Sequence, residues 1–137
     1  NTTGWTLTKF AKSNTKKHNG YYALKGTLGA VTDIATAQKT TPTLVAGQSY
    51  TFSAYVRTTD LTTFKTDVPH GVFLKVITNS GTFVSEPVDY ATADAVERGW
   101  VRLAVPFTPT VTGTATVSIE GTGAKGSFYA DDILPYF

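Results

Sequence analysis

The sequence predicts an all-β domain built as a two-sheet antiparallel β-sandwich. Threonine is its most frequent residue and methionine is absent, a composition rich in strand formers and poor in strong helix formers. Short stretches of alternating apolar and polar residues recur along the chain, separated by turn residues, as is typical of sandwiches. No amphipathic helical pattern lies between them, which argues against an α/β fold.

The first part of the chain predicts four strands. Residues 4–10 alternate apolar and polar side chains, and residues 12–20 form a polar, basic connector that ends in the turn signal Asn-Gly. Residues 21–25 predict a short strand and residues 30–38 a further one, although a helix would also tolerate the second stretch. The clearest alternation lies in 47–57, where tyrosine, phenylalanine, alanine and valine share one side from residue 50 onward.

The middle of the chain predicts a hairpin between two long connectors. Residues 58–71 are a polar loop, long enough to be uncommon without a function. Residues 72–78 and 82–85 read as two strands joined by Asn-Ser-Gly. Residues 86–97 form the second connector, and we expect one helical turn in it, over 91–96.

The last part predicts three strands. Residues 100–107 place four apolar side chains on one face, and the proline near their end suggests an edge or a strand end. Residues 114–120 alternate cleanly, and residues 121–126 are rich in glycine and predict a flexible turn. Residues 127–134 close the domain.

Length and composition limit the classes of protein. The 137 residues fit one domain, 1–137, that can bury a core without disulfides. The absence of cysteine excludes disulfides, thiolate zinc sites and a cysteine nucleophile. A net charge of +2 with 16% charged residues gives no nucleic-acid footprint, and no apolar run approaches the roughly 20 residues that span a bilayer. The chain has no initiating methionine or signal-like start, so we expect a mature or excised domain.

Three stretches carry a resemblance to a known family. They are GQSYTFSAYVR at 47–57, GWVRL at 99–103 and SFYADDI at 127–133. Together with GYYAL at 20–24 and Gln38, they resemble the jelly-roll, galactose-binding-like carbohydrate-binding modules appended to bacterial glycoside hydrolases, the xylan- and cellulose-binding kind. Closely similar domains also occur in large bacterial surface proteins.

This resemblance implies a five-on-four sandwich with a sugar-binding cleft on its concave sheet. It also implies a structural calcium ion on the side away from the cleft, held by Asp131 or Asp132 and by backbone carbonyls, with residues 19–20 nearby. Such modules open with an Asn and a Phe-Glu strand, which this sequence lacks before residue 4. We therefore expect the first edge strand and the calcium coordination to be incomplete.

Outward-facing positions on the predicted strands supply what sugar binding needs. A pyranose ring stacks its C–H groups on a flat aromatic face, and polar side chains bond its hydroxyls. The candidate rings are Tyr55, Phe73 and Tyr129. The candidate hydrogen-bonding partners are Arg57, Lys75, Arg102 and Glu120, an assortment that suits a polar, uncharged ligand.

Each of these residues has a structural alternative. The rings and charges could cover a solvated sheet or pack beneath the loop at 58–71, because neighbouring rings commonly pack together. Trp100 could be a further stacking platform or could support the sandwich. Asp131 and Asp132 are strand neighbours, which point to opposite faces unless a bulge intervenes, so they cannot easily flank a scissile glycosidic bond. Ligation of a hard cation such as calcium fits these two carboxylates better, and solvated surface charge is the alternative.

The sequence therefore predicts a non-catalytic module, not an enzyme. We expect it to bind a polysaccharide on the sheet that contains Tyr55, as a monomer tethered to other domains of a secreted or cell-surface protein. The competing hypothesis is a structural or adhesive sandwich module of a large bacterial cell-surface protein, without a sugar site.

Overall fold

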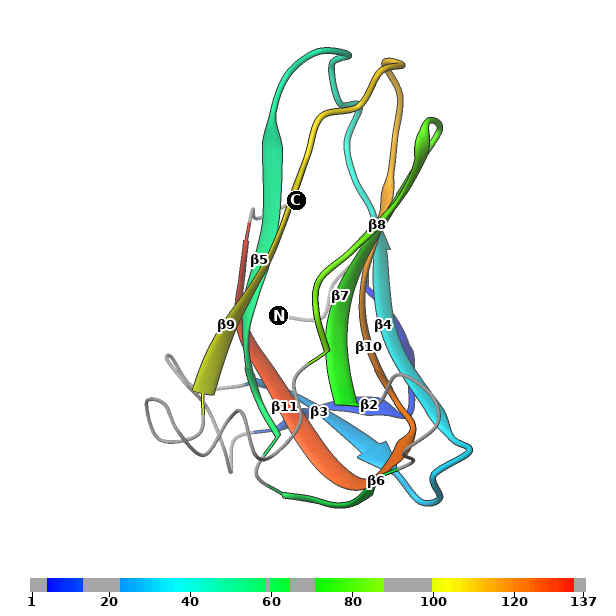
Figure 1. Cartoon of the computed structure of the whole chain (residues 1–137), viewed down its shortest axis with the longest axis vertical. Helices are drawn as coiled ribbons and strands as arrows, with labels where there is room; N and C mark the ends of the chain where they lie inside the picture. Colours follow the sequence, from blue (N-terminus) through cyan, green and yellow to red (C-terminus); the bar gives the residue numbers. More distant parts are fainter. Residues whose placement is uncertain (1–4, 14–22, 59, 65–70, 88–99, 135–137) are drawn as a thin grey trace.

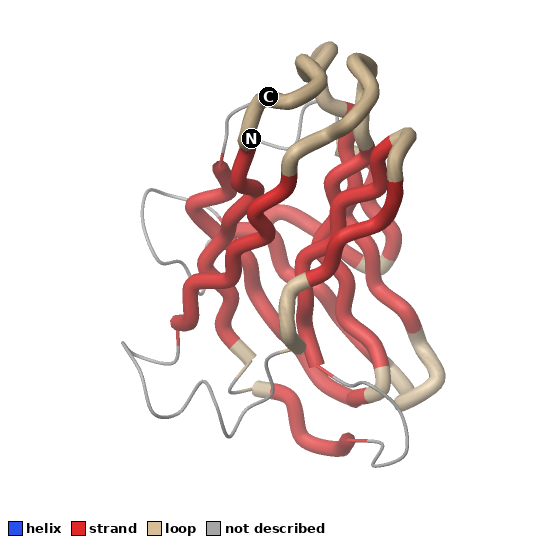
Figure 2. Tube along the Cα trace, turned by 45° about the horizontal axis from the view of Figure 1, so that its top comes forward, coloured by secondary structure: helices blue, strands red, loops and turns tan. Residues whose placement is uncertain are grey.

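The computed structural model of the chain describes residues 5–13, 23–58, 60–64, 71–87 and 100–134. These residues form eleven strands and no helix (Figures 1 and 2). The strands make two antiparallel sheets that pack face to face, so the predicted all-β sandwich is confirmed. Within the same residues, nothing helical is long and apolar enough to cross a membrane.

The first sheet has five strands. Its edges are the three-residue β1 and the hairpin strand β8. In spatial order its strands are β1 (Thr6–Thr8), β4 (Ile34–Thr40), β10 (Thr116–Thr122), β7 (Gly71–Thr78) and β8 (Gly81–Val84).

The second sheet has six strands, one of which pairs with β11 beside the main path. In spatial order the path is β2 (Phe10–Ser13), β3 (Ala23–Leu28), β11 (Ala124–Leu134), β5 (Tyr50–Arg57) and β9 (Trp100–Phe107), and β6 (Leu61–Phe64) pairs with β11. The arrangement is thus five strands on six, where the resemblance implied five on four.

The core lies between the two sheets and follows from the alternation of the strands. In β5, Phe52, Ala54 and Val56 are fully buried on the inner side, because side chains of a strand point to alternate faces. Leu74 of β7 and Ile119 of β10 meet them from the other sheet. Burying this apolar surface is the main favourable term for the fold.

Two strands at the start of the chain replace the single one predicted over residues 4–10. The break falls at Lys9, whose backbone has a positive φ of 58° and whose carbonyl accepts the N–H of Thr27 at 2.9 Å. This left-handed residue passes the chain from β1 in one sheet to β2 in the other. Alternation alone contains no signal for such a crossing.

Other boundaries also differ from the predictions. The loop expected over 58–71 contains β6, and the flexible turn expected over 121–126 is a tight turn at Gly123, whose φ is 66°. Residues 29–33 form a turn before β4, in which the Asp33 carboxylate accepts the N–H groups of Gly29 and Ala30 at 2.9 and 3.2 Å. The helical turn predicted over 91–96 lies outside the described residues.

Candidate functional site

The outer face of the six-stranded sheet brings together most of the predicted site residues. Residues that pair across antiparallel strands share a face, and the register aligns two neighbouring rows across β3, β11, β5 and β9. One row contains Lys25, Tyr129, Arg57 and Trp100, and the other contains Asp131, Tyr55 and Arg102. We call these seven residues the Tyr55 face.

Two of the three rings on the Tyr55 face are buried. Trp100 exposes 5% and Tyr129 exposes 4% of its surface, and they form a second, small apolar cluster with Ala23. Tyr55 packs against this cluster and is half-buried. The expectation that Tyr129 is an exposed ring is wrong, and for Trp100 the burial fits the alternative that it supports the sandwich. Rings on neighbouring strands bury each other even on the outward side of a sheet. Tyr55 is the ring of this face that solvent still reaches.

The cations of the Tyr55 face differ in their surroundings. The Arg57 guanidinium lies 3.4 Å from the carboxylate of Asp60, three residues along the chain. The Lys25 ammonium lies 5.9 Å from the centre of the Tyr129 ring, within reach of a cation–π interaction. Arg102 is exposed and pairs across the strands with Tyr55. This face therefore combines a partly open phenol ring with positive hydrogen-bond donors.

The remaining three candidates lie on the opposite side of the molecule. Phe73 and Lys75 are in β7 and Glu120 is in β10, so all three face outward from the five-stranded sheet. The Lys75 ammonium lies 3.8 Å from a carboxylate oxygen of Glu120. The expectation of a single surface for all candidates is therefore wrong: alternation separates inward from outward positions but does not say which sheet a strand joins.

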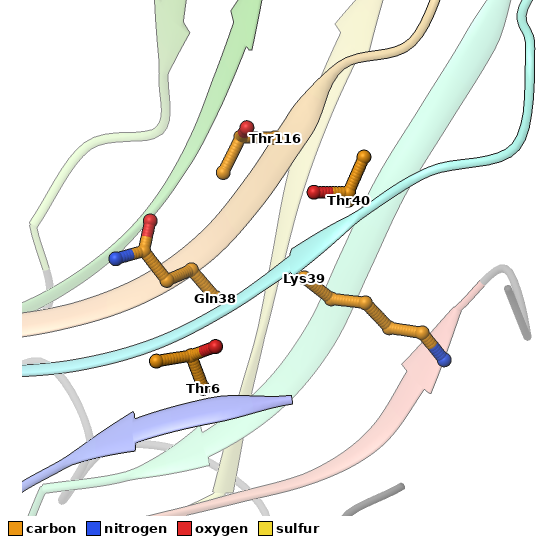
Figure 3. Close-up of a pocket in the computed structure, with 5 residues that line it drawn as sticks. All are labelled: Thr6, Gln38, Lys39, Thr40 and Thr116. Atoms are coloured by element: carbon orange, nitrogen blue, oxygen red, sulfur yellow. The ribbon is translucent and has the colours of Figure 1, made fainter. Parts of the chain in front are cut away.

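This opposite surface is rich in small hydroxyl side chains, and we call it the threonine face. Its rows, read from the strand register, contain Thr6, Gln38, Ser118, Lys75 and Val84; Thr8, Thr36, Glu120 and Phe73; and Thr40, Thr116 and Ile77. A hollow of about 330 Å³ lies beside β1 and is lined by Thr6, Gln38, Lys39, Thr40 and Thr116 (Figure 3). In Figure 3 the Lys39 side chain leaves β4 on the side opposite to Gln38.

Sequence reasoning did not single out these hydroxyls. Their signal is the outward series of threonines and Gln38 in β4 and β10, which is also what any solvated strand shows. Composition alone therefore could not separate a site here from ordinary surface.

The predicted metal ligands lie at an irregular point of β11. The strand register shifts between Asp131 and Leu134, and Asp132 has a positive φ of 51°. The Asp131 carboxylate accepts the N–H of Asp132 at 2.8 Å. Asp131 pairs with Tyr55 and therefore lies on the Tyr55 face, whereas the resemblance implied a calcium site on the side away from the sugar-binding sheet.

The fit of this pair to a calcium ion is partial. Carboxylates suit a hard cation, but the described part of the chain contains no group of three or more His, Cys, Asp or Glu residues that could hold a metal. Backbone carbonyls would have to complete the ligand set. Calcium binding by Asp131 and Asp132 stays a prediction.

The similarity of this chain to known proteins lies in its structure. No protein-family model and no curated protein sequence matches the chain. A family 61 carbohydrate-binding module in complex with β-1,4-galactotriose superposes with a TM-score of 0.62 and 14% identity, covering 96% of this chain and 87% of the module. The chain has the β-sandwich fold of carbohydrate-binding modules.

Two longer proteins contain a similar domain. The CBM22-1–GH10 modules of the Clostridium thermocellum endo-1,4-β-D-xylanase 10B, complexed with xylohexaose, match with a TM-score of 0.58 and 16% identity over 95% of this chain. The enzymatically active domain of tailspike protein 4 from bacteriophage CBA120 matches with a TM-score of 0.66 and 10% identity over 97% of this chain. The chain spans 25% of the first and 19% of the second.

Proposed function

We propose that this chain is a non-catalytic carbohydrate-binding module that holds a polysaccharide against the Tyr55 face. The observation that carries the proposal is the register of β11, β5 and β9, which gathers Tyr55, Arg102 and Asp131 in one row on an outer sheet face. These groups come from three segments far apart in the sequence. Solved structures with this fold include modules complexed with galactotriose and with xylohexaose.

The chemistry of the row suits a sugar chain. The partly open Tyr55 ring offers a flat surface to the C–H groups of one pyranose. The Arg102 guanidinium supplies hydrogen-bond donors and the Asp131 carboxylate supplies acceptors for hydroxyls on either side. Affinity at a single shallow site should lie between about micromolar and millimolar, because the sugar exchanges bonds to water for bonds to protein.

The same proposal includes the setting of the module. Tethering to other domains of a secreted or cell-surface protein would let this weak site act by raising the local concentration of its partner domain on the glycan. The competing function, a structural or adhesive sandwich without a sugar site, shares the same fold, since fold does not fix function.

Affinity electrophoresis separates these two functions. The panel would contain xylan, β-glucan, β-1,4-galactan, mannan and pectin, with wild type beside Tyr55→Ala, which removes the open ring. We expect retardation of wild type on at least one glycan and loss of at least about tenfold in affinity for Tyr55→Ala, the size expected for one ring contact.

The matched control for this experiment is Phe73→Ala. It removes a ring of similar size from the outer face of the other sheet and should leave binding unchanged. Migration of wild type at the same speed on every glycan would favour the adhesive function, and equal loss in both variants would move the site away from the Tyr55 face.

A further inference from the structure

We propose that the polysaccharide bound on the Tyr55 face is acidic, that is, a glycan that carries uronate carboxylates. This inference rests on the function proposed above and specifies its ligand. It follows from how the fold divides charged side chains between the two outer faces.

The division removes an expected anion from the site. On the sequence, Arg57, Lys75, Arg102 and Glu120 formed a mixed set that suited an uncharged ligand. In the structure Lys75 and Glu120 pair with each other at 3.8 Å on the threonine face. The Tyr55 face keeps two of those cations, Arg57 and Arg102, and gains Lys25 from β3.

The carboxylates near this face have bonds of their own. Asp60 lies 3.4 Å from the Arg57 guanidinium, and Asp131 accepts a backbone N–H at 2.8 Å. Within the described ranges, neither Lys25 nor Arg102 forms an ion pair. Two cations on this face are therefore available to an anion from outside the chain.

Because two of the rings are buried, ligand binding on this face depends more on the cations. Trp100 and Tyr129 are covered, so stacking on them cannot contribute to binding. The groups of this face that a ligand can reach include the partly open Tyr55, the exposed Arg102 and the partly exposed Lys25 and Asp131, so the reachable cations outnumber the carboxylate. An arginine fork bonds a carboxylate through two parallel N–H donors, and a lysine attracts it as a point charge.

The spacing of the two cations suits a chain more than a single sugar. Lys25 lies on β3 and Arg102 on β9, with β11 and β5 between them. Three strand spacings amount to roughly 14 Å. A polymer running across the strands could thus place carboxylates of different sugar units at the two cations, with Tyr55 between them.

The test compares acidic glycans with the same glycans after their carboxyl groups are reduced to alcohols. Polygalacturonate, alginate and glucuronoxylan would each be measured beside the reduced form, by affinity electrophoresis and by calorimetry, at low and at high sodium chloride. We expect at least about tenfold tighter binding to one acidic form, and a loss of that preference at high salt because exposed charges are screened.

Charge-removing variants locate the effect. Arg102→Gln and Lys25→Gln should each lower the affinity for the acidic glycan by about threefold to tenfold, as expected for one exposed or half-exposed charge-assisted bond. Lys75→Gln is the matched control, because it removes the same charge from the threonine face and should leave the affinity unchanged. Thermal melting of each variant verifies that the fold is retained.

The outcomes distinguish the inference from the proposed function. Equal binding to acidic and reduced glycans, unaffected by Arg102→Gln and Lys25→Gln, would overturn the acidic ligand and leave a carbohydrate-binding module. Equal weakening by Lys75→Gln would also overturn the inference, because net charge and not this face would then be responsible. Binding to no glycan, acidic or neutral, would overturn both.

Discussion

Replacement of Gly26 by alanine tests how the two sheets are held together. Phe128 of β11 is fully buried, and its ring lies over Gly26 of β3, its partner in the strand register. The same ring reaches Gly121 of β10 in the facing sheet. Phe10 packs edge-on against it, with ring centres 5.1 Å apart. The ring of Phe128 therefore fills a space that exists because two glycines lack a side chain.

The size of the effect follows from this packing. A methyl group on Gly26 would fall within 2.8 Å of three carbon atoms of the Phe128 ring, and the ring is enclosed by both sheets. Overpacking of this kind costs about 1–3 kcal/mol, and the lower chain entropy of alanine offsets about 0.5–1 kcal/mol of it. We expect Gly26→Ala to lower the free energy of unfolding by about 1–2 kcal/mol, which is a fall in Tm of roughly 3–8 °C.

Urea unfolding and thermal melting measure this effect, and a double variant tests its cause. In Gly26→Ala/Phe128→Leu the smaller leucine side chain makes room for the methyl group. The loss of stability in the double variant should therefore be smaller than the sum of the losses in the two single variants, by at least about 0.5 kcal/mol. Gly29→Ala is the control, since its methyl group would meet only Asp33 at 3.4 Å. A Gly26→Ala protein as stable as wild type, or strictly additive costs in the double variant, would refute the reasoning.

Two further predictions concern single sites. The buried Thr41 hydroxyl accepts the N–H of Ala115 at 3.0 Å and donates to the carbonyl of Pro42 at 2.7 Å, so Thr41→Val leaves a buried donor unpaired. It should cost about 1–3 kcal/mol in urea unfolding, and an unchanged midpoint would contradict this role. If Asp131 and Asp132 hold calcium, calcium chloride should raise Tm above the value in chelator, because an ion that binds only the folded state stabilises it. The rise should vanish in Asp132→Asn, whereas a flat response in wild type would remove the metal site.

The strands whose position the sequence predicts best are the inner strand β5 and the edge strand β9 of the six-stranded sheet. Strand β9 (Trp100–Phe107) has the predicted bounds, and β5 (Tyr50–Arg57) lies where its alternation begins, because in both the apolar side chains form one continuous inner row. The crossing at Lys9 was missed, since it depends on one left-handed residue between two short strands. The tight turn at Gly123 was missed for a similar reason: glycine marks a bend but not its length.

The candidate site was predictable to the extent that it depends on strand alternation. Tyr55 and Arg57 point outward, as predicted. Each pairs with one residue of β11 and one residue of β9 on the same face. Phe73 also points outward, but from the other sheet. Which sheet a strand joins is a long-range property that a local two-residue period does not encode. The same limit explains why the sequence placed Glu120 with the cations Arg57 and Arg102, although it lies on the outer face of the opposite sheet.

Burial of outward rings was the second property that alternation could not supply. Tyr129 alternates as Tyr55 does, yet it exposes 4% of its surface and joins Trp100 in a separate cluster. Whether an outward ring is exposed or covered depends on side chains from other strands, and in the cluster around Tyr129 these are Ala23 of β3, Tyr55 of β5 and Trp100 of β9. Counting outward rings therefore overestimates the stacking surface of this domain. Alternation also underestimates the number of cations on the Tyr55 face, because Lys25 lies on this face only through the pairing of β3 with β11.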